Sequence, residues 1–291
     1  MVQEADIRDF WSTHPCGDHI PSGLDTRGDY ENFFSEYDAQ KYRLETHIPV
    51  CLAGLDVDGR RVLEVGLGQG AESELLIRRG AHWSGVDVTD TSVERVRKRL
   101  QLRSLPFVSL QRGSVLGLPF PDASFDVVFS HGVLHHVPDI SSAQREIHRV
   151  LAANGELVVM VYARWSLNYL ICIALLRRLA LITTYPLAAC GIVRPTGVLA
   201  SHLRNARKIG LMRYLRMREF IHRNTDGPEN LFSRVYDTRR VRRDFETFTV
   251  TRSYKRFMHA PPLPVHRLPG QAIAGWHLWV HLKPRVITAA S

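Results

Sequence analysis

The chain has 291 residues, of which 45% are hydrophobic and 23% charged, a balance that excludes an intrinsically disordered protein. This length predicts one large domain, or a core domain with a sizeable insertion. The net charge of +9 is unevenly spread, because residues 177–223 contain ten Lys or Arg and a single acid, Glu219. The sequence therefore predicts an anionic partner for that segment.

Cysteine usage indicates the compartment. The four cysteines are scattered and form no C-x-x-C pair; they are Cys16, Cys51, Cys172 and Cys190. This pattern argues against a zinc site and against a disulfide scaffold, and we expect no metal. Residues 1–10 are polar and acidic, so we expect no secretory signal. Together these features predict a cytoplasmic protein.

Residues 1–50 are interpreted as an N-terminal helical extension. Apolar residues fall at helical spacing up to Pro49; they are Phe33, Phe34, Tyr37 and Leu44. One interpretation is a helix that caps the core. The other is a lid over a cofactor, in which Tyr37, Tyr42 or Arg43 reaches the ligand.

Residues 61–71 read R-V-L-E-V-G-L-G-Q-G-A. The apolar run predicts a buried strand of a parallel sheet. Gly66, Gly68 and Gly70 predict a loop whose backbone can approach a ligand closely, and residues 72–79 predict a helix after it. A strand, a glycine loop and a helix N-terminus together are typical of a nucleotide-type site.

This stretch alone permits three interpretations. Gly66, Gly68 and Ala71 satisfy G-x-G-x-x-A, a dinucleotide-binding fingerprint. Glu64 with the three glycines forms E-x-G-x-G-x-G, which resembles the first motif of class I S-adenosylmethionine (SAM) methyltransferases. A glycine turn without a ligand is the third interpretation.

Residues 82–87 predict a second strand that ends at Asp87. An acid at the tip of the strand next to the glycine loop can accept two hydrogen bonds from a ribose diol, which disfavours a 2′-phosphate ligand. The structural alternative is a cap for a helix over residues 91–100, a role that suits Asp90 or Thr91 better.

A helix over residues 92–102 and a third strand over residues 107–111 are predicted next. Gly113, Ser114 and Val115 follow. The resemblance implies an acid at position 114 that accepts from the adenine amino group. Ser114 can also accept, more weakly, and the backbone around Ser114 and Val115 could contact the base edge.

Residues 118–139 read L-P-F-P-D-A-S-F-D-V-V-F-S-H-G-V-L-H-H-V-P-D. They predict a fourth strand over residues 125–129, with Ser130, His131 and Gly132 at its carboxyl end. The segment closely resembles the L-P-F…F-D…L-H-H-V pattern of type 11 methyltransferases, the SAM-dependent group that includes the ubiquinone/menaquinone C-methyltransferases. This resemblance favours SAM over NAD.

Three histidines are candidate catalytic bases, because an O- or N-methyl transfer leaves a proton to remove. They are His131, His135 and His136, and His131 is favoured by its place at the strand tip. The resemblance also implies a structural alternative, in which the His-His pair pins its loop to the following helix.

A helix over residues 141–151 that stops at Ala153-Asn154-Gly155, and a fifth strand over residues 156–162, complete a regular alternation. Residues 164–234 break it. Arg177-Arg178 interrupts the apolar residues 165–189, which predicts two amphipathic helices and no membrane span. Residues 199–222 predict a basic helix with one apolar stripe, formed by Leu203, Ala206, Ile209, Met212 and Leu215.

We interpret this insertion as a lid over the acceptor site. A helical cap with a solvated basic face is the structural alternative. The charge favours a hydrophobic acceptor with an anionic group, or peripheral docking on an anionic membrane. RNA binding is disfavoured because no RNA-binding module is present and few aromatics interleave with the arginines.

Residues 238–245 predict a helix, and residues 246–254 and 275–282 predict the last two strands. The resemblance to class I methyltransferases implies that the final strand is antiparallel. The fold class is thus α/β: a Rossmann-like, seven-stranded, mostly parallel sheet with helices on both faces and a helical insertion. The expected division is an extension (1–50), a SAM-binding core (51–163), the insertion (164–235) and the C-terminal part of the core (236–291).

The resemblance implies methyl transfer from SAM to a small molecule, in secondary or lipid metabolism. The expected cofactor-binding residues are Glu64, Gly66, Leu67, Gly68, Gly70, Asp87, Val88, Ser114, Val115, Ser130, His131 and Gly132. Among them, Ser130, His131 and Gly132 are expected near the sulfonium. The alternatives are a methyltransferase acting on protein or RNA, and a catalytically silent SAM-binding protein.

Overall fold

The computed structural model describes residues 2–17, 29–265 and 268–285. A seven-stranded sheet forms its centre, with strand order β3-β2-β1-β4-β5-β7-β6. Strands β1 to β5 run parallel to one another, and β7 runs antiparallel to both β5 and β6. The strands are β1 (Arg61–Val65), β2 (His82–Asp87), β3 (Ser109–Arg112), β4 (Phe125–His131), β5 (Leu151–Tyr162), β6 (Phe248–Arg256) and β7 (His277–Pro284).

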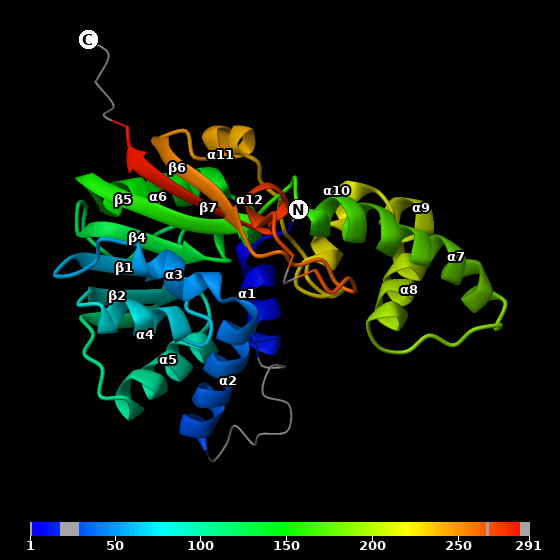
Figure 1. The fold of residues 1–291 in the computed structure, drawn as a ribbon, viewed down its shortest axis with the longest axis horizontal. Helices are drawn as coiled ribbons and strands as arrows, with labels where there is room; N and C mark the ends of the chain where they lie inside the picture. The colour runs from blue at the N-terminus through cyan, green and yellow to red at the C-terminus, as the bar shows by residue number, and fades with distance from the viewer. Residues whose placement is uncertain (1, 18–28, 266–267, 286–291) are drawn as a thin grey trace, which may run out of the picture.

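Helices cover both faces of this sheet, and a helical arm projects from one end (Figure 1). The helices against the core are α1 (Glu4–Thr13), α2 (Tyr30–Leu44), α3 (His47–Ala53), α4 (Ala71–Arg78), α5 (Asp90–Leu102), α6 (Ile140–Val150), α11 (Thr238–Asp244) and α12 (Gln271–Ala274). The arm contains a π-helical segment (Asn168–Arg177), α7 (Arg178–Ala189), α8 (Gly197–Ile209), α9 (Leu211–Tyr214) and α10 (Met217–Phe220). The predicted Rossmann-like α/β fold with a helical insertion is confirmed.

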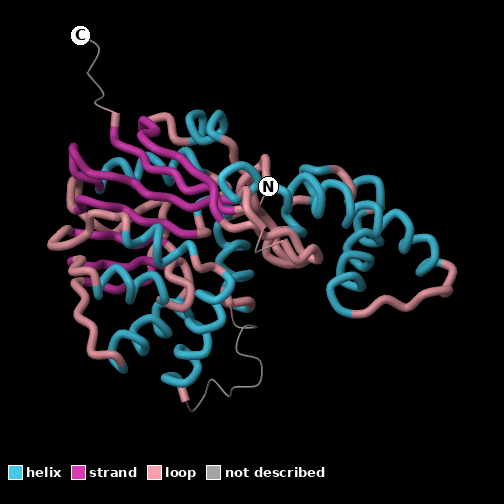
Figure 2. The backbone as a smooth tube through the Cα atoms, in the orientation of Figure 1, coloured by secondary structure: helices cyan, strands magenta, loops and turns pink. Residues whose placement is uncertain are grey.

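Apolar side chains of the strands point to both faces and bury two clusters, as expected for a doubly covered sheet. Leu63 and Val128 pack against α6 and α11 on one face. Val62 and Phe129 lie on the other face, against α3, α4 and α5. Figure 2 shows the strands as one continuous layer between these helices.

The end of α6 corrects the expected stop at Ala153-Asn154-Gly155. The helix ends at Val150, and the next residue already belongs to β5, where Leu151 pairs with Phe125. A Cβ on Gly155 would lie 2.9 Å from the Ala152 carbonyl oxygen and 3.0 Å from that of Asp126. This glycine therefore permits close packing within the strand and does not end a helix.

The apolar segment after β5 also differs from the prediction. It forms one continuous helical run, Asn168–Ala189, and not two helices, because Arg177 and Arg178 both keep helical backbone angles. Arginine is a good helix former, so a charged pair does not by itself end a helix. By length and composition the run could cross a membrane: it has 22 residues, a mean hydropathy of 1.6 and only 17% burial.

The N-terminal extension packs mainly through α2, whose Phe33, Phe34 and Tyr37 are buried. Leu44, expected on the same stripe, is 55% exposed. Pro49 does not mark the end of that helix, because it lies inside the separate helix α3.

A buried ion network joins this extension to the core. Arg99 of α5 is fully buried; its Nε donates to Glu74 at 2.9 Å, and its other amines donate to Asp38 of α2 and to the Gln69 carbonyl at 3.0 Å. Charges removed from water in this way are stable only while every partner remains. One guanidinium therefore couples the extension, α4 and the glycine loop.

Replacing this guanidinium should strongly destabilise the fold. We expect Arg99→Ala to lower the free energy of unfolding by about 2–3 kcal/mol, because Glu74 and Asp38 each lose one of their two arginine partners while Arg103 remains. Arg60→Ala is the control: it removes an exposed ion pair to Asp56 and should cost less than about 1 kcal/mol. Urea denaturation followed by circular dichroism measures both, and equal losses would contradict the coupling.

Candidate functional site

The glycine loop leaves β1 in a conformation that favours glycine. Gly66, Gly68 and Gly70 have φ of 80°, 51° and 77°. A Cβ on Gly66 would lie 2.2 Å from a Val133 methyl group, whereas a Cβ on Gly68 would meet nothing nearer than 3.9 Å. Gly66 is thus needed for packing, while the backbone at Gly68 faces free space that a ligand can enter.

Asp87 ties this loop to the end of β2. Its Oδ2 accepts from the Leu67 N–H at 2.8 Å, and its Oδ1 accepts from the N–H and hydroxyl of Thr89 at 2.9 and 2.8 Å. Burial raises the pKa of this carboxyl, and these donors oppose the rise. The cap of α5 is Thr89, whose Oγ1 accepts from Ser92, and neither Asp90 nor Thr91 as expected.

A cavity of about 700 Å³ opens at the carboxyl ends of the parallel strands. Ten of the residues singled out from the sequence line it: Glu64, Gly66, Leu67, Gly68, Asp87, Val88, Val115, His131, Gly132 and His136. Four do not: Gly70, Ser114, Ser130 and His135. The binding roles assigned to all of them stay predictions.

Two of the residues that do not line the cavity have side chains that form hydrogen bonds elsewhere. The Ser130 hydroxyl is fully buried and donates to the Val65 carbonyl at 3.0 Å, which joins β4 to β1. The Ser114 hydroxyl donates to the Glu4 carboxylate and accepts from the Leu116 N–H at 2.9 Å. Glu4, on α1, itself lines the cavity, so the extension supplies a carboxylate beside position 114.

Sequence reasoning missed a buried ion pair in the cavity wall. Lys41 Nζ lies 2.5 Å from Glu72 Oε1. Although burial opposes ionisation of both, Lys41 lowers the pKa of Glu72 to about 2, and Glu72 raises that of Lys41. Lys41 lies one helical turn after Tyr37 on α2, and this spacing could have indicated that the two share a face.

His131 presents a neutral imidazole to the same cavity. Burial lowers its pKa to about 4, and its Nδ1 lies 3.8 Å from Glu72. Its Nε2 is buried and has no hydrogen-bond partner among the described residues. Near neutral pH the imidazole is therefore neutral, and one of its two nitrogens carries a lone pair.

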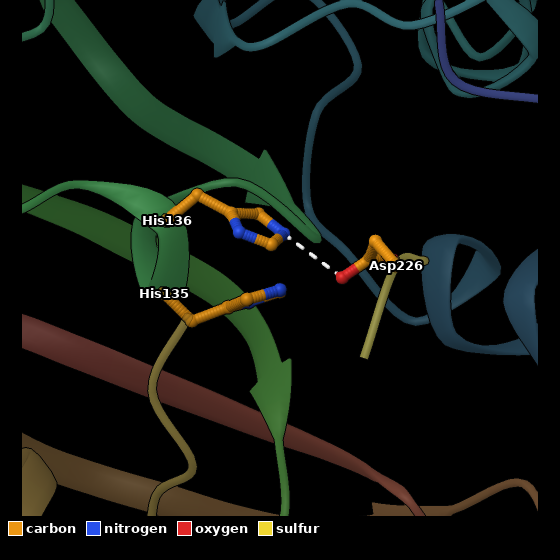
Figure 3. Close-up of side chains that lie close together, drawn as sticks. All are labelled: His135, His136 and Asp226. Carbon is orange, nitrogen blue, oxygen red and sulfur yellow. Dashed lines mark ion pairs between the residues drawn. The ribbon is translucent and has the colours of Figure 1, made fainter. Parts of the chain in front are cut away.

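The other two histidines lie with Asp226, at the end of the insertion (Figure 3). His136 Nδ1 donates to the Phe232 carbonyl at 2.7 Å, and its Nε2 faces Asp226 Oδ2 at 3.1 Å. The Arg234 N–H donates to the His135 carbonyl at 2.9 Å. These contacts attach the loop that carries His135 and His136 to residues 226–234, at the end of the insertion. The structural alternative had expected an attachment to the following helix instead.

His135 is fully buried and its ring lies 4.0 Å from that of Tyr162, which donates to Asp226 Oδ1 at 2.7 Å. Ring nitrogens of both histidines and an oxygen of Asp226 lie within 4.8 Å of one another, so the trio could hold a metal ion. The sequence prediction of no metal stays a prediction.

The far half of the cavity is built from segments that carried no motif. It is lined by Phe257, Met258, His259, Ala260, Pro261, Pro262, Leu263, Trp276 and His277, and by Asn168, Arg177, Asn224, Thr225 and Asp226 of the insertion. Among the described residues, none from 178 to 223 reaches the cavity. The insertion, which was expected to be a lid, thus lines the cavity only with residues near its two ends, while α7, α8 and α9 extend away from the sheet (Figure 1).

A model of the methyltransferase domain family matches residues 63–159. This part of the chain is therefore similar to a methyltransferase domain. SAM is the cofactor of such a domain, and the glycine loop, the half-buried Asp87 and the open space at Gly68 fit a nucleoside with a free ribose.

Curated proteins with similar sequences are also methyltransferases. A fatty-acid O-methyltransferase of Mycolicibacterium smegmatis is 37% identical over 105 residues, which cover 35% of this chain and 37% of the relative. A phthiotriol/phenolphthiotriol dimycocerosates methyltransferase of Mycobacterium ulcerans is 34% identical over 119 residues, 40% of each chain. The chain therefore spans about two fifths of the length of these relatives.

Solved structures resemble a larger part of the chain. A SAM-dependent methyltransferase from Methanosarcina mazei gives a TM-score of 0.52 at 17% identity, covering 81% of this chain and 97% of that one. One from Aquifex aeolicus gives 0.51 at 14% identity, covering 88% and 98%. These likenesses concern the fold of the methyltransferase domain with its flanking elements.

The lowered pKa of His131 predicts how acid affects stability. The unfolded chain binds a proton on this residue below about pH 6.5, whereas the folded chain does not until about pH 4. The contribution of His131 to the free energy of unfolding is therefore fully present above pH 6.5 and is lost as the pH drops toward 4. We expect His131→Gln to reduce that loss by at most about 3 kcal/mol.

Urea denaturation of wild type and His131→Gln at pH 7, 6, 5 and 4 measures this effect. His82→Gln, which changes an exposed histidine outside the cavity, is the matched control and should lose stability as wild type does. Parallel curves for wild type and His131→Gln would show that the burial of His131 does not shape the acid response.

Proposed function

We propose that this protein is a SAM-dependent methyltransferase that acts on a hydrophobic small molecule of secondary or lipid metabolism. One observation carries the proposal: a single cavity has the glycine loop and Asp87 at one end and an apolar wall at the other. A cofactor and an acceptor bound in the same cavity can meet without solvent between them, which direct methyl transfer requires.

The far wall favours an apolar acceptor. Met258, Ala260, Leu263 and Trp276 line it, together with two consecutive prolines. Two of the curated relatives are named for fatty acids and for phthiotriol dimycocerosates, both hydrophobic acceptors. An RNA or protein acceptor is less favoured, because those substrates usually require an open polar surface rather than an apolar recess.

The chemistry needs little from the protein beyond alignment. SAM supplies an electrophilic methyl group when bound. The chain then holds the acceptor in line with that group and excludes water. His131 is the proposed base for an O- or N-acceptor, because its neutral imidazole carries a nitrogen free of protein partners.

The insertion is proposed to dock peripherally on an anionic membrane, from the cytoplasmic side. Large apolar side chains are exposed on it: Leu170, Leu175, Leu179, Ile182, Leu187, Ile192, Val198 and Met212. Within the insertion, residues 177–223 hold ten Lys or Arg and one acid. Exposed apolar residues among basic ones are typical of helices that lie in the interface of anionic bilayers.

The cofactor assignment can be tested with the demethylated product of SAM. We expect this product to bind wild type, and Asp87→Ala to weaken binding by roughly tenfold or more, since hydrogen bonds to a half-buried carboxylate are lost. Asp90→Ala is the control, because the Asp90 carboxylate is exposed and pairs with Arg112. Calorimetry measures all three, and NAD binding in place of this ligand would reject the proposal.

Membrane docking can be tested by co-flotation with vesicles. Wild type should float with phosphatidylcholine vesicles containing phosphatidylglycerol and much less with phosphatidylcholine alone. Leu179→Glu with Ile182→Glu should abolish flotation, whereas Val108→Glu, at an exposed apolar site on the core, should not. No flotation of wild type, a constitutive dimer held by the same residues, or equal loss in the control would refute docking.

A further inference from the structure

We propose that Arg177 binds the carboxylate of the acceptor, so that the substrate is an amphipathic carboxylic acid. This inference rests on the proposed function and names the substrate class. It is suggested by the position of Arg177, which lines the far half of the cavity at the junction of the π-helical segment and α7.

The protein partners of this guanidinium are neutral. Its Nη1 donates to the Asn224 carbonyl at 2.9 Å and its Nη2 to the Pro261 carbonyl at 3.4 Å. Arg99 and Arg103, by contrast, each contact two carboxylates. Among the residues that the structure describes, Arg177 makes no ion pair.

The acidic side chains that line the cavity already interact with other residues of the protein. Asp226 pairs with His136 and accepts from Tyr162, and Glu72 pairs with Lys41. The remaining four lie toward the extension and the glycine loop: Glu4 bonds to Ser114, Glu45 lies 3.8 Å from His277, Glu64 accepts from Trp83, and Asp87 accepts from Leu67 and Thr89. The guanidinium is therefore uncompensated in the far half of the cavity.

An uncompensated charge in such a place is costly. Burial lowers the pKa of Arg177, and the nearby cation helps to lower that of His259 to about 4, with burial as the main cause. An anion that entered the cavity would relieve this cost, whereas a neutral acceptor would not. A planar guanidinium also matches a carboxylate with two parallel hydrogen bonds.

The neighbouring residues explain why the acid would be amphipathic. Arg177 is fixed to Pro261, within the apolar wall formed by Met258, Ala260 and Leu263. The two carbonyl contacts hold the head of the side chain against this wall. A carboxylate at the guanidinium would therefore leave its hydrocarbon part in contact with apolar groups.

The test compares three twelve-carbon probes on the full chain: dodecanoic acid, dodecanol and dodecyl phosphate. Binding is measured by calorimetry, with the demethylated product of SAM present. Wild type should bind the acid roughly 10- to 100-fold more tightly than the alcohol. Arg177→Met should lose this preference, and Arg177→Lys should keep part of it.

Arg178→Met is the matched control, because Arg178 is the next residue of the same helix and does not line the cavity. It should behave as wild type. Arg177→Met is expected to fold, since an apolar side chain replaces an unpaired charge, and Arg177→Lys supplies a second variant that keeps the charge.

Three results would overturn the inference: no preference for the acid in wild type, an unchanged preference in Arg177→Met, or tighter binding of the phosphate than of the acid. Binding of the demethylated product separates these failures from failure of the proposed function. It should be the same in wild type and in Arg177→Met, because Arg177 lies outside the glycine-loop half of the cavity.

Discussion

The site depends on one carboxylate. Asp87 accepts from Leu67 in the glycine loop and from Thr89 at the start of α5, so the loop after β1 and the loop after β2 keep a fixed relative position. Parallel strands bring these two loops to the same edge of the sheet, but pairing of the strands does not determine the path of either loop. The hydrogen bonds of Asp87 fix these paths, and they define the near end of the cavity.

Charge in the cavity wall is arranged in two ways. Glu72 and Lys41 remain ionised because each compensates the other. His131 and His277 remain neutral near pH 7 because burial lowers the pKa of each. The wall thus combines one compensated ion pair and neutral imidazoles with Arg177, whose protein partners are neutral.

The sequence predicted the parts of this protein that are determined locally. Strands β1, β2 and β4 follow from short apolar runs, and the glycine loop follows from Gly66 and its neighbours. The boundary between α6 and β5 was wrong, because Gly155 allows close strand packing that no sequence pattern distinguishes from a helix stop. The continuous helix Asn168–Ala189 was also missed, because two arginines were given more weight than helix propensity.

The far half of the cavity could not be predicted, since its residues meet only in three dimensions. Asp226 contacts His136 across a separation of 90 residues, and Arg177 contacts Pro261 across 84. Lys41 and Glu72 likewise come from different helices. Periodicity shows which side of a helix is buried, but it does not show which distant side chain will pair with a given charge.

The contact between Glu4 and Ser114 has a practical consequence for anyone who purifies this protein. Because Glu4 lines the cavity and lies three residues from the first methionine, an affinity tag fused upstream would emerge close to the binding site. Strand β7 starts at His277 in the cavity wall and runs away from it to Pro284. A tag on the carboxyl-terminal side is the safer design for ligand soaking and assay work.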